Sequence, residues 1–408
     1  MKKTVGALGL LIGTILLMVA CQKLLPEKRD HAQILGAPLE GLSSQQLKQH
    51  MIGDAEFGRV FSEANGLGPI FVATSCEGCH IGDGKGHPFT TLTRFCQYNG
   101  TGYDPMLKMG GPQLQHRCIS GYTAEVIPAG VTGSSKFLPP AVAGLGFLAS
   151  VSDDDILALA DSADANGDGI SGVPNYIPPP SFFIPQSWHT PLKGKYIGRF
   201  GRKAAAIDLL QQTANAYLND IGITSDFNPQ DLFNVQVGAY SGDHCADPEI
   251  SANTVQNVVF YMRTLKAPER RDAGDADVIA GENIFTQIGC NKCHTPSLKT
   301  GPSDIEALRY KTFYPYTDLL LHDMGNELND GYTEGSAKAG EWRTTPLWGL
   351  GISKFAQGGQ YFLMHDGRAK SIEDAISYHG GEGQNSRSVF NALDAGAREK
   401  LIKFLESL

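Results

Sequence analysis

The sequence predicts a mainly α-helical protein made of two related modules, the first enlarged by a loop-rich insertion. The first observation is a repeated string, C-x-x-C-H, which occurs at 76–80 and again at 290–294. The second is a pattern of apolar residues with helical spacing that closes each half. The third is composition, since 48 glycines and 22 prolines indicate long loops between the helices.

A glycine followed by an aromatic residue precedes each string. These are Gly58 and Phe61 in "GRVF", and Gly281 and Phe285 in "GENIF". A glycine on a helix lets a second helix cross closely, because no Cβ stands between the backbones. The pairing resembles the N-terminal helix of cytochromes c.

The helices that close the two halves are read from "SANTVQNVVFYMRTLKAP" and "AREKLIKFLESL". In the first, Val255, Val258, Val259 and Met262 fall at i, i+3, i+4 and i+7, and Ser251 stands at the N-cap position. Each half therefore predicts a cytochrome-c-like domain.

The ends of the predicted domains follow from composition. The first 20 residues read as a lipoprotein signal peptide, with "MKK" before an apolar run and "LMVAC" as a lipobox. Cys21 would then carry lipid, and 21–50 would form a tether. The domains are expected at 51–270 and 278–408, on either side of the charged linker "APERRDAGDAD".

The N-terminus also predicts the compartment. Export to the periplasmic side follows from the signal peptide, and Gln22 after the lipidated cysteine favours the outer membrane over the inner. A plain membrane anchor is the alternative reading. The formal net charge of −9 argues against nucleic-acid binding and favours a basic docking partner.

The repeated string has one chemical reading that uses all of its residues. Two thiols at this spacing can form thioethers with the two vinyl groups of one haem, and the adjacent histidine can bind its iron. A zinc site would leave the histidines unexplained, and a redox dithiol would need a βαβ setting. Two covalently bound haem c groups are therefore predicted, held by Cys76, Cys79 and His80 and by Cys290, Cys293 and His294.

The second axial ligand of each iron decides between electron transfer and catalysis. For the second haem we expect His379, which lies on an apolar helical stripe in "SIEDAISYHGGE". His322, Met324, Met364 and His365 are competing donors.

The first haem offers a less definite distal side. His87, Met106, Met109 and His116 are possible donors, and none stands in a telling pattern. Glu125 in "GYTAEVIP" is a candidate acid–base group beside an open iron; a surface carboxylate is the alternative reading.

A third type of site is suggested inside the insertion. Asp164, Asn166 and Asp168, followed by Gly169, space oxygen ligands as the start of a calcium-binding EF-hand loop does. The twelfth position is Asn175 rather than glutamate, so calcium is possible here only with a remote ligand, and a hydrated turn is the alternative.

Three cysteines remain outside these sites. Cys96 and Cys118 could form a disulfide in an oxidising compartment, which would leave Cys245 free or buried.

From about residue 50 onward the chain resembles the bacterial di-haem c-type oxidoreductases of the peroxidase type, relatives of di-haem cytochrome c peroxidase and of the enzyme that matures methylamine dehydrogenase. The matching stretches are "CEGCHIGDGKG", "DANGDGISGVPN", "YIGRFGRKAA", "NDIGITS", "YTDLLLHDMG", "EWRTTPLWGLG" and "FLMHDGRAKSIEDAISYHGGE".

The resemblance implies roles for further residues. His379 falls where those peroxidases carry a methionine ligand, which implies bis-histidine ligation and a lower potential. The position of their distal histidine falls on Cys96, so that ligand cannot be carried over. Arg343 would hold a haem propionate, and Trp342 and Trp348 could lie between the haems, although core packing is the simpler role for both.

Together these features predict an exported, peroxidase-like di-haem oxidoreductase. Electrons from a redox partner, such as a small cytochrome or cupredoxin, would enter at the C-terminal haem and pass to a substrate-reactive N-terminal haem, where peroxide or another small oxidant is reduced. The alternatives are a non-enzymatic electron-transfer protein, an enzyme that oxidises a protein partner, and a redox component of a metal-uptake system.

Overall fold

The computed structural model describes residues 35–238 and 242–408. The predicted signal peptide, Cys21 and the first part of the predicted tether lie outside the described residues. In the described part of the chain, no helix is long and apolar enough to cross a membrane.

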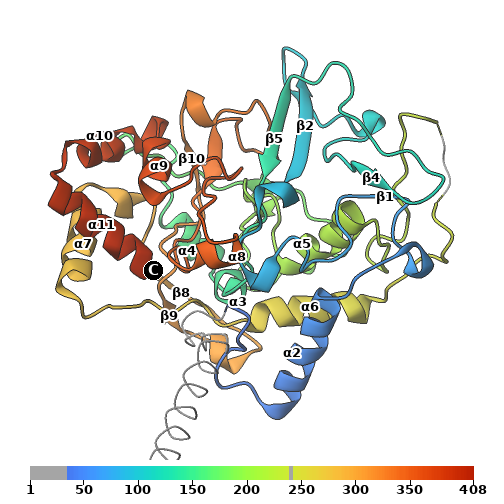
Figure 1. Ribbon diagram of the computed structural model, residues 1–408, viewed down its shortest axis with the longest axis horizontal. Helices are drawn as coiled ribbons and strands as arrows, with labels where there is room; N and C mark the ends of the chain where they lie inside the picture. Colours follow the sequence, from blue (N-terminus) through green and yellow to red (C-terminus); the bar gives the residue numbers. More distant parts are fainter. Residues whose placement is uncertain (1–34, 239–241) are drawn as a thin grey trace, which may run out of the picture. The chain divides into compact units, whose positions relative to one another are not determined.

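The fold is mixed and helix-dominant, with 32% helix and 12% strand, so the mainly α-helical prediction is confirmed only in part. The α-helices are α2 (Ser44–Phe57), α3 (Leu145–Ala149), α4 (Asp153–Leu157), α5 (Leu209–Ala216), α6 (Ala252–Thr264), α7 (Ala276–Gln287), α8 (Ser353–Ala356), α9 (Ile372–Ser377), α10 (Gln384–Ala392) and α11 (Ala395–Ser407) (Figure 1).

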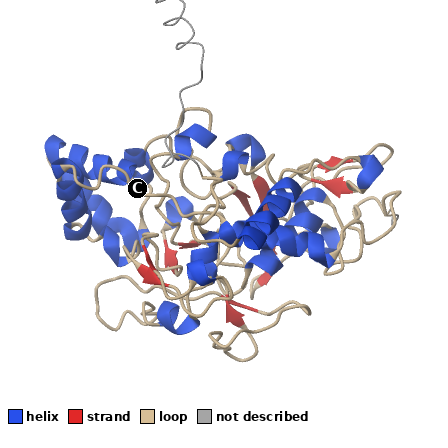
Figure 2. Ribbon diagram, turned by 90° about the horizontal axis from the view of Figure 1, so that it is seen from below, coloured by secondary structure: helices blue, strands red, loops and turns tan. Residues whose placement is uncertain are grey.

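The strands are short and lie among long loops (Figure 2). They are β1 (Ile70–Phe71), β2 (Leu92–Tyr98), β3 (Tyr103–Asp104), β4 (Arg117–Cys118), β5 (Gly133–Phe137), β6 (Tyr176–Ile177), β7 (Tyr196–Ile197), β8 (Leu298–Lys299), β9 (Thr312–Phe313), β10 (Leu321–Asp323) and β11 (Glu341–Arg343). All pairings are antiparallel, in the orders β1-β4, β3-β2-β5, β6-β7, β8-β9 and β10-β11.

Two helix pairs repeat the same close crossing, α7 with α11 and α2 with α6. On α7, a Cβ at Gly281 would lie 2.0 Å from the Lys400 carbonyl oxygen of α11. On α2, a Cβ at Gly53 would lie 2.1 Å from the Asn257 carbonyl oxygen of α6. Only glycine permits either contact.

The predicted Gly58 and Phe61 pair is therefore wrong. Gly58 caps the end of α2, and its nearest contact is a glutamate side chain. The true counterpart of Gly281 and Phe285 is Gly53 with Phe57, at the same spacing on the helix. Gly58 lies nearer to the C-x-x-C-H string than Gly53 does, but proximity in sequence does not decide which glycine meets α6.

The helix starts agree better with the sequence. Ser251 caps α6 by accepting a hydrogen bond from the Thr254 backbone N–H, as predicted. Ser152 caps α4 in the same way through Asp155. A serine hydroxyl at this position satisfies a backbone donor that the first helical turn leaves free.

The two halves of the chain share one hydrophobic core. The largest cluster joins residues of α2, α5 and α6 to Leu298, Phe313 and Trp348 from the second half. A second cluster, built on α7 and α11, contains only residues from 278 onward. The two C-x-x-C-H strings thus stand on a common framework.

Part of the predicted tether belongs to this framework. Leu35 and Leu39 are buried, and the Leu39 N–H donates to the Thr264 carbonyl at 2.7 Å. His50, within α2, is also buried and pairs with the Thr264 hydroxyl at 2.8 Å. The predicted tether boundary at residue 50 is therefore too late.

The disulfide that the sequence allows between Cys96 and Cys118 is not formed, since both cysteines are free. Cys96 lies on β2 in the three-stranded sheet, whereas Cys118 lies on β4, which pairs with β1. Their thiols donate instead to the Gly331 and Tyr122 carbonyls. Cys245 is also free.

Replacing Gly281 by alanine tests the crossing. Gly281→Ala places a methyl group against the Lys400 carbonyl, and we expect the unfolding free energy to fall by about 1–3 kcal/mol despite the better helix propensity of alanine. Thermal and denaturant unfolding of the holoprotein would measure it. Gly274→Ala is the control, because a Cβ there meets nothing within 4 Å; equal stability of the two variants would contradict the crossing.

Candidate functional site

The histidine of the first string is oriented by the backbone. The Nδ1 of His80 donates to the Pro140 carbonyl at 2.7 Å. Because a carbonyl oxygen can only accept, the proton sits on Nδ1 and leaves the Nε2 lone pair free. Burial lowers the pKa of His80 to about 4, which keeps the ring neutral. Phe57 of α2 contacts the ring, with centroids 6.1 Å apart.

The second string repeats this arrangement. The Nδ1 of His294 donates to the Tyr316 carbonyl at 3.0 Å, and burial lowers the pKa of His294 to about 4. Phe285 of α7 stands 6.4 Å from the ring, as Phe57 does for His80. Both strings thus present a neutral imidazole whose Nε2 can bind a metal.

His379 faces His294 across a gap. It follows the end of α9, and its Nδ1 donates to the Ala375 carbonyl at 2.9 Å, so its Nε2 is also free. The two ring centroids are 6.4 Å apart. The ring centroids of two imidazoles that bind one metal lie roughly 6 Å apart, since each metal–nitrogen bond is about 2 Å long and each ring nitrogen lies about 1 Å from its centroid.

The cavity around these two histidines is predominantly apolar. It is lined by Cys290 and Cys293 of the string, by residues of α7 and α9, and by the loops before them. Its apolar side chains include Phe285, Leu347, Leu350, Leu363, Ile372, Ile376 and Leu405. A flat apolar macrocycle suits such walls.

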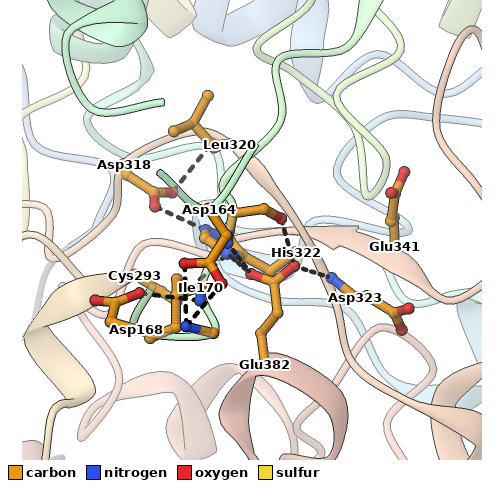
Figure 3. Close-up of polar contacts among 12 residues, drawn as sticks. Asp164, Asp168, Ile170, Cys293, Asp318, Leu320, His322, Asp323, Glu341 and Glu382 are labelled. Atoms are coloured by element: carbon orange, nitrogen blue, oxygen red, sulfur yellow. Dashed lines mark hydrogen bonds and ion pairs between the residues drawn. The ribbon is translucent and has the colours of Figure 1, made fainter. Parts of the chain in front are cut away.

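The competing histidines are already engaged. The ring nitrogens of His322 lie 2.8 Å from Asp318 and 2.6 Å from Glu382 (Figure 3). The Nε2 of His365 lies 2.8 Å from Asp330. The sulfur donors Met324 and Met364 line the cavity without an oriented partner like that of His379.

Four cations line the same cavity; Arg387 pairs with Glu327, and the other three are Lys85, Arg202 and Arg343. Arg202 donates to the Leu138 carbonyl, and Arg343 donates to the Gly201 and Thr344 carbonyls. Within the described residues, none of the three has a carboxylate within ion-pair distance. Burial, together with the nearby charge of Arg202, lowers the pKa of Lys85 to about 7. Such a cluster fits a ligand with carboxylates, as the haem propionates are.

The four string cysteines do not resemble thiolates. Burial raises the pKa of Cys76, Cys79 and Cys290 to about 12, and burial also raises that of Cys293. Metal-bound or redox-active thiols need the opposite shift. Among the described residues, the one convergent His/Cys/Asp/Glu group is Asp231, Asp247 and Glu249, away from both strings. The redox-dithiol reading is therefore disfavoured.

Glu125 is buried rather than a surface carboxylate. It is 4% exposed, and its Oε2 accepts the Gln115 backbone N–H at 2.9 Å. Burial raises its pKa to about 7, in the range of a group that exchanges protons at neutral pH. The Gln115 side chain donates to the Asn219 carbonyl, beside Asp220. The charge of Asp220 in turn acts on both cysteines of the first string.

The possible distal donors of the first string are spread out. Met106 is buried, Met109 and His116 are exposed, and His87 accepts the Phe89 N–H and stacks on that ring. In the part of the chain that the structure describes, none of them faces His80 as His379 faces His294.

The predicted calcium loop folds on itself. Asp164 accepts the Gly169 N–H, and Asn166 accepts the Asp168 N–H. Asp168 also forms a 3.0 Å ion pair with Lys292, inside the second string. Asn175 is buried and bonds to the Lys203 and Glu334 carbonyls, so it does not complete the loop.

The two tryptophans differ. Trp342 on β11 stacks on His365 with centroids 3.7 Å apart and has the Lys203 ammonium 3.8 Å from a ring centroid. Trp342 packs with Cys96 from the first half of the chain, and it lines the cavity around His294 and His379. Trp348 belongs to the main core.

Sequence reasoning missed Lys85, Arg202 and the Asp318–His322–Glu382 cluster. A pattern search could not find them, because lysine and arginine are usually solvated and these acquire their role only through burial. The stretches "YIGRFGRKAA" and "YTDLLLHDMG" contain three of the five residues, and their unusual mix of charge and apolarity was the available signal.

The comparisons assign a family. Residues 27–93 and 130–408 match the family described as "Di-haem oxidoreductase, putative peroxidase", and the chain therefore belongs to it. This confirms the resemblance, and the family implies two haems. The unmatched stretch, 94–129, includes Glu125.

Two solved structures are similar over much of the chain. One is a hydrazine synthase from Kuenenia stuttgartiensis, with 14% identity, TM-score 0.40, and coverage of 94% of this chain and 95% of that one. The other is a MauG-like protein associated with microbial copper homeostasis, with 15% identity, TM-score 0.30, and coverage of 65% and 87%. No curated protein matches the chain.

Glu125 gives a pH-dependent prediction. Its pKa is higher in the folded chain than the usual value of 4.5, so the folded state binds this proton more tightly and stability falls as pH rises from about 4.5 to about 7. In Glu125→Gln the group cannot ionise. We expect the variant to gain about 1–3 kcal/mol relative to wild type between pH 5 and pH 8, measured by urea unfolding. Glu373→Gln, on exposed α9 surface, should show no such gain; a constant difference at both pH values would contradict the prediction.

Proposed function

We propose that this chain is an exported di-haem c oxidoreductase of the peroxidase type. The observation that carries the proposal is the pair His294 and His379, whose ring centroids lie 6.4 Å apart in one cavity with Cys290 and Cys293 and whose Nδ1 atoms both bond to backbone carbonyls, which leaves each Nε2 free for a metal. Haem supplies a redox-active iron and a conjugated macrocycle that shares its charge.

The chain's own residues would hold the two groups as follows. Each cysteine pair forms thioethers, which explains why neutral, buried thiols stand beside a histidine. His80 and His294 would each bind the iron of the haem attached to their own string, and His379 would bind the iron at the C-terminal site together with His294. Arg343 binds a propionate, as do Lys85 and Arg202 in the same cavity.

The two sites would divide the work. The C-terminal site, with two imidazoles, is closed to exogenous ligands and suits electron transfer. The N-terminal site has one oriented imidazole, His80, and keeps a side open for peroxide or another small oxidant. Electrons would therefore run from the C-terminal to the N-terminal haem, and Trp342 with His365 offers a stacked aromatic path between the modules.

Glu125 would serve the open side by holding a proton at Oε1. The Gln115 N–H fixes the other carboxylate oxygen, and the raised pKa keeps the group partly protonated near neutral pH. Reduction of peroxide to water consumes protons, so a buried carboxyl of this kind can deliver one and recover it from solvent.

The remaining expectations form part of the proposal. The chain would be tethered at the periplasmic side through lipid on Cys21, at the outer membrane, and would receive electrons from a small cytochrome or cupredoxin. Calcium at Asp164, Asn166 and Asp168 would lock the loop that abuts Lys292.

Haem content tests the attachment residues. In Cys290→Ala/Cys293→Ala we expect covalent haem to fall from two groups per chain to one, measured by pyridine haemochrome and by haem staining of denatured protein. Cys76→Ala/Cys79→Ala should do the same. Cys96→Ala is the control and should retain both groups. Two covalent groups in either double variant would refute the assignment of its string.

Reaction with peroxide tests the activity. The holoprotein is reduced by one electron per chain, hydrogen peroxide is added without oxygen, and the haem absorption is followed. We expect rapid reoxidation, slowed by about 100-fold in Glu125→Gln with the starting spectrum unchanged. An unchanged wild-type spectrum would mean that both irons are closed, and the non-enzymatic electron carrier would replace the enzyme.

A further inference from the structure

The segment 316–322 lies between His294 and His379 in the sequence. It contacts the groups that hold both histidines in place. The carbonyl of Tyr316 accepts the Nδ1 hydrogen of His294 and so orients the proximal ring. Asp318 follows two residues later, and His322 lies on β10 of the same segment. The proximal support and the His322 cluster therefore belong to one continuous piece of chain.

His322 is enclosed by acceptors. Its side chain is 3% exposed, its Nε2 lies 2.8 Å from Asp318 Oδ2, and its Nδ1 lies 2.6 Å from Glu382 Oε2 (Figure 3). The Cys293 sulfur stands 3.5 Å from the same Nδ1. Although burial disfavours a charge, the bonds to Asp318, Cys293 and Glu382 raise the pKa of His322 to about 12. A carboxylate on each ring nitrogen holds the imidazole doubly protonated.

Glu382 connects this cluster to the distal ligand, which it follows by three residues. Its carboxylate accepts the Ser171 N–H and hydroxyl, the Asp323 N–H and the His322 ring. These bonds lower the pKa of Glu382 to about 2, against the effect of burial. A carboxylate with four donors is fixed in place, and so is the turn that carries it.

The turn itself is packed against β10 and its exit. A Cβ at Gly381, which has φ of +51°, would lie 2.2 Å from the Asp323 carbonyl oxygen, and one at Gly380 would lie 2.8 Å from that of Met324. The glycines in "HGGEG" thus allow the backbone after His379 to touch the "DMG" turn. This close approach brings Glu382 within reach of His322.

We propose that His322 is a positioning residue for the C-terminal haem, and that the Asp318–His322–Glu382 ion cluster holds His379 opposite His294. The cluster ties the distal turn to the segment that already orients the proximal ring, and it stands against Cys293. The inference rests on the proposed function, because it takes His294 and His379 as the two ligands of one iron.

The test measures how firmly His379 stays bound in the holoprotein. Glu382→Gln removes the negative charge of the Glu382–His322 ion pair with little change in volume. His322→Gln removes the positive charge of the same pair. In both we expect part of the low-spin absorption of one haem to convert to high-spin, and carbon monoxide to bind the reduced C-terminal haem about 10- to 100-fold faster. Added imidazole should restore the low-spin spectrum.

Two controls separate this result from general destabilisation. Glu373→Gln changes an exposed carboxylate on α9, the helix that precedes His379, and should match wild type. The double variant Glu382→Gln/His322→Gln should show no larger effect than the stronger single variant, because both remove one interaction.

His379→Ala distinguishes failure of the inference from failure of the proposed function. If that variant keeps the low-spin spectrum, His379 is not the ligand and the proposed ligation itself is wrong. If it becomes high-spin while Glu382→Gln and His322→Gln keep the wild-type spectrum and rate, the proposed role of the Asp318–His322–Glu382 ion cluster is overturned. If neither Glu382→Gln nor His322→Gln accumulates as folded holoprotein, Ser171→Ala tests the ion cluster instead. This variant removes one hydrogen-bond donor to Glu382. A faster reaction with carbon monoxide supports the proposed role of the ion cluster, whereas the wild-type rate overturns it.

Discussion

A hydrogen bond from imidazole Nδ1 to a backbone carbonyl is the interaction on which the rest of the arrangement depends. It recurs at His80, His294 and His379, with Pro140, Tyr316 and Ala375 as the acceptors. In each case the bond selects the tautomer and leaves Nε2 free, and His294 and His379 line the same cavity. Because the acceptors are backbone atoms, the fold of two loops and of α9 sets the direction of the three imidazole rings.

Those loops are held by close helix crossings and by buried charge. Gly53 and Gly281 let α2 and α7 approach their partners, which places Phe57 and Phe285 against the proximal rings. Around the cavity of His294 and His379, Lys85, Arg202 and Arg343 stand without carboxylate partners among the described residues, and His322 stands between two carboxylates. Charges so placed cost free energy in the protein alone, and a ligand with its own carboxylates would relieve the first group.

Local sequence patterns predicted features that depend on neighbours in the sequence. They failed for features that depend on contact between distant segments. The caps at Ser152 and Ser251 and the crossing glycine Gly281 were recoverable, since each is set by neighbours in the sequence. The Gly58 assignment was wrong and the Cys96–Cys118 disulfide is not formed, because the approach of α6 and the division of β2 and β4 between sheets leave no trace in local spacing.

By itself the sequence determined the two C-x-x-C-H strings and the family, and it led to the expectation of His379 as a ligand, because each depends on residue type at short spacing. Only the tertiary structure decided that His322 and His365 are occupied, that Lys85 and Arg202 join Arg343 at one cavity, and that Glu125 is buried. The physical reason is that burial and charge pairing are properties of neighbours in space. A side chain's pKa, its free lone pairs and its available partners exist only after the loops have met.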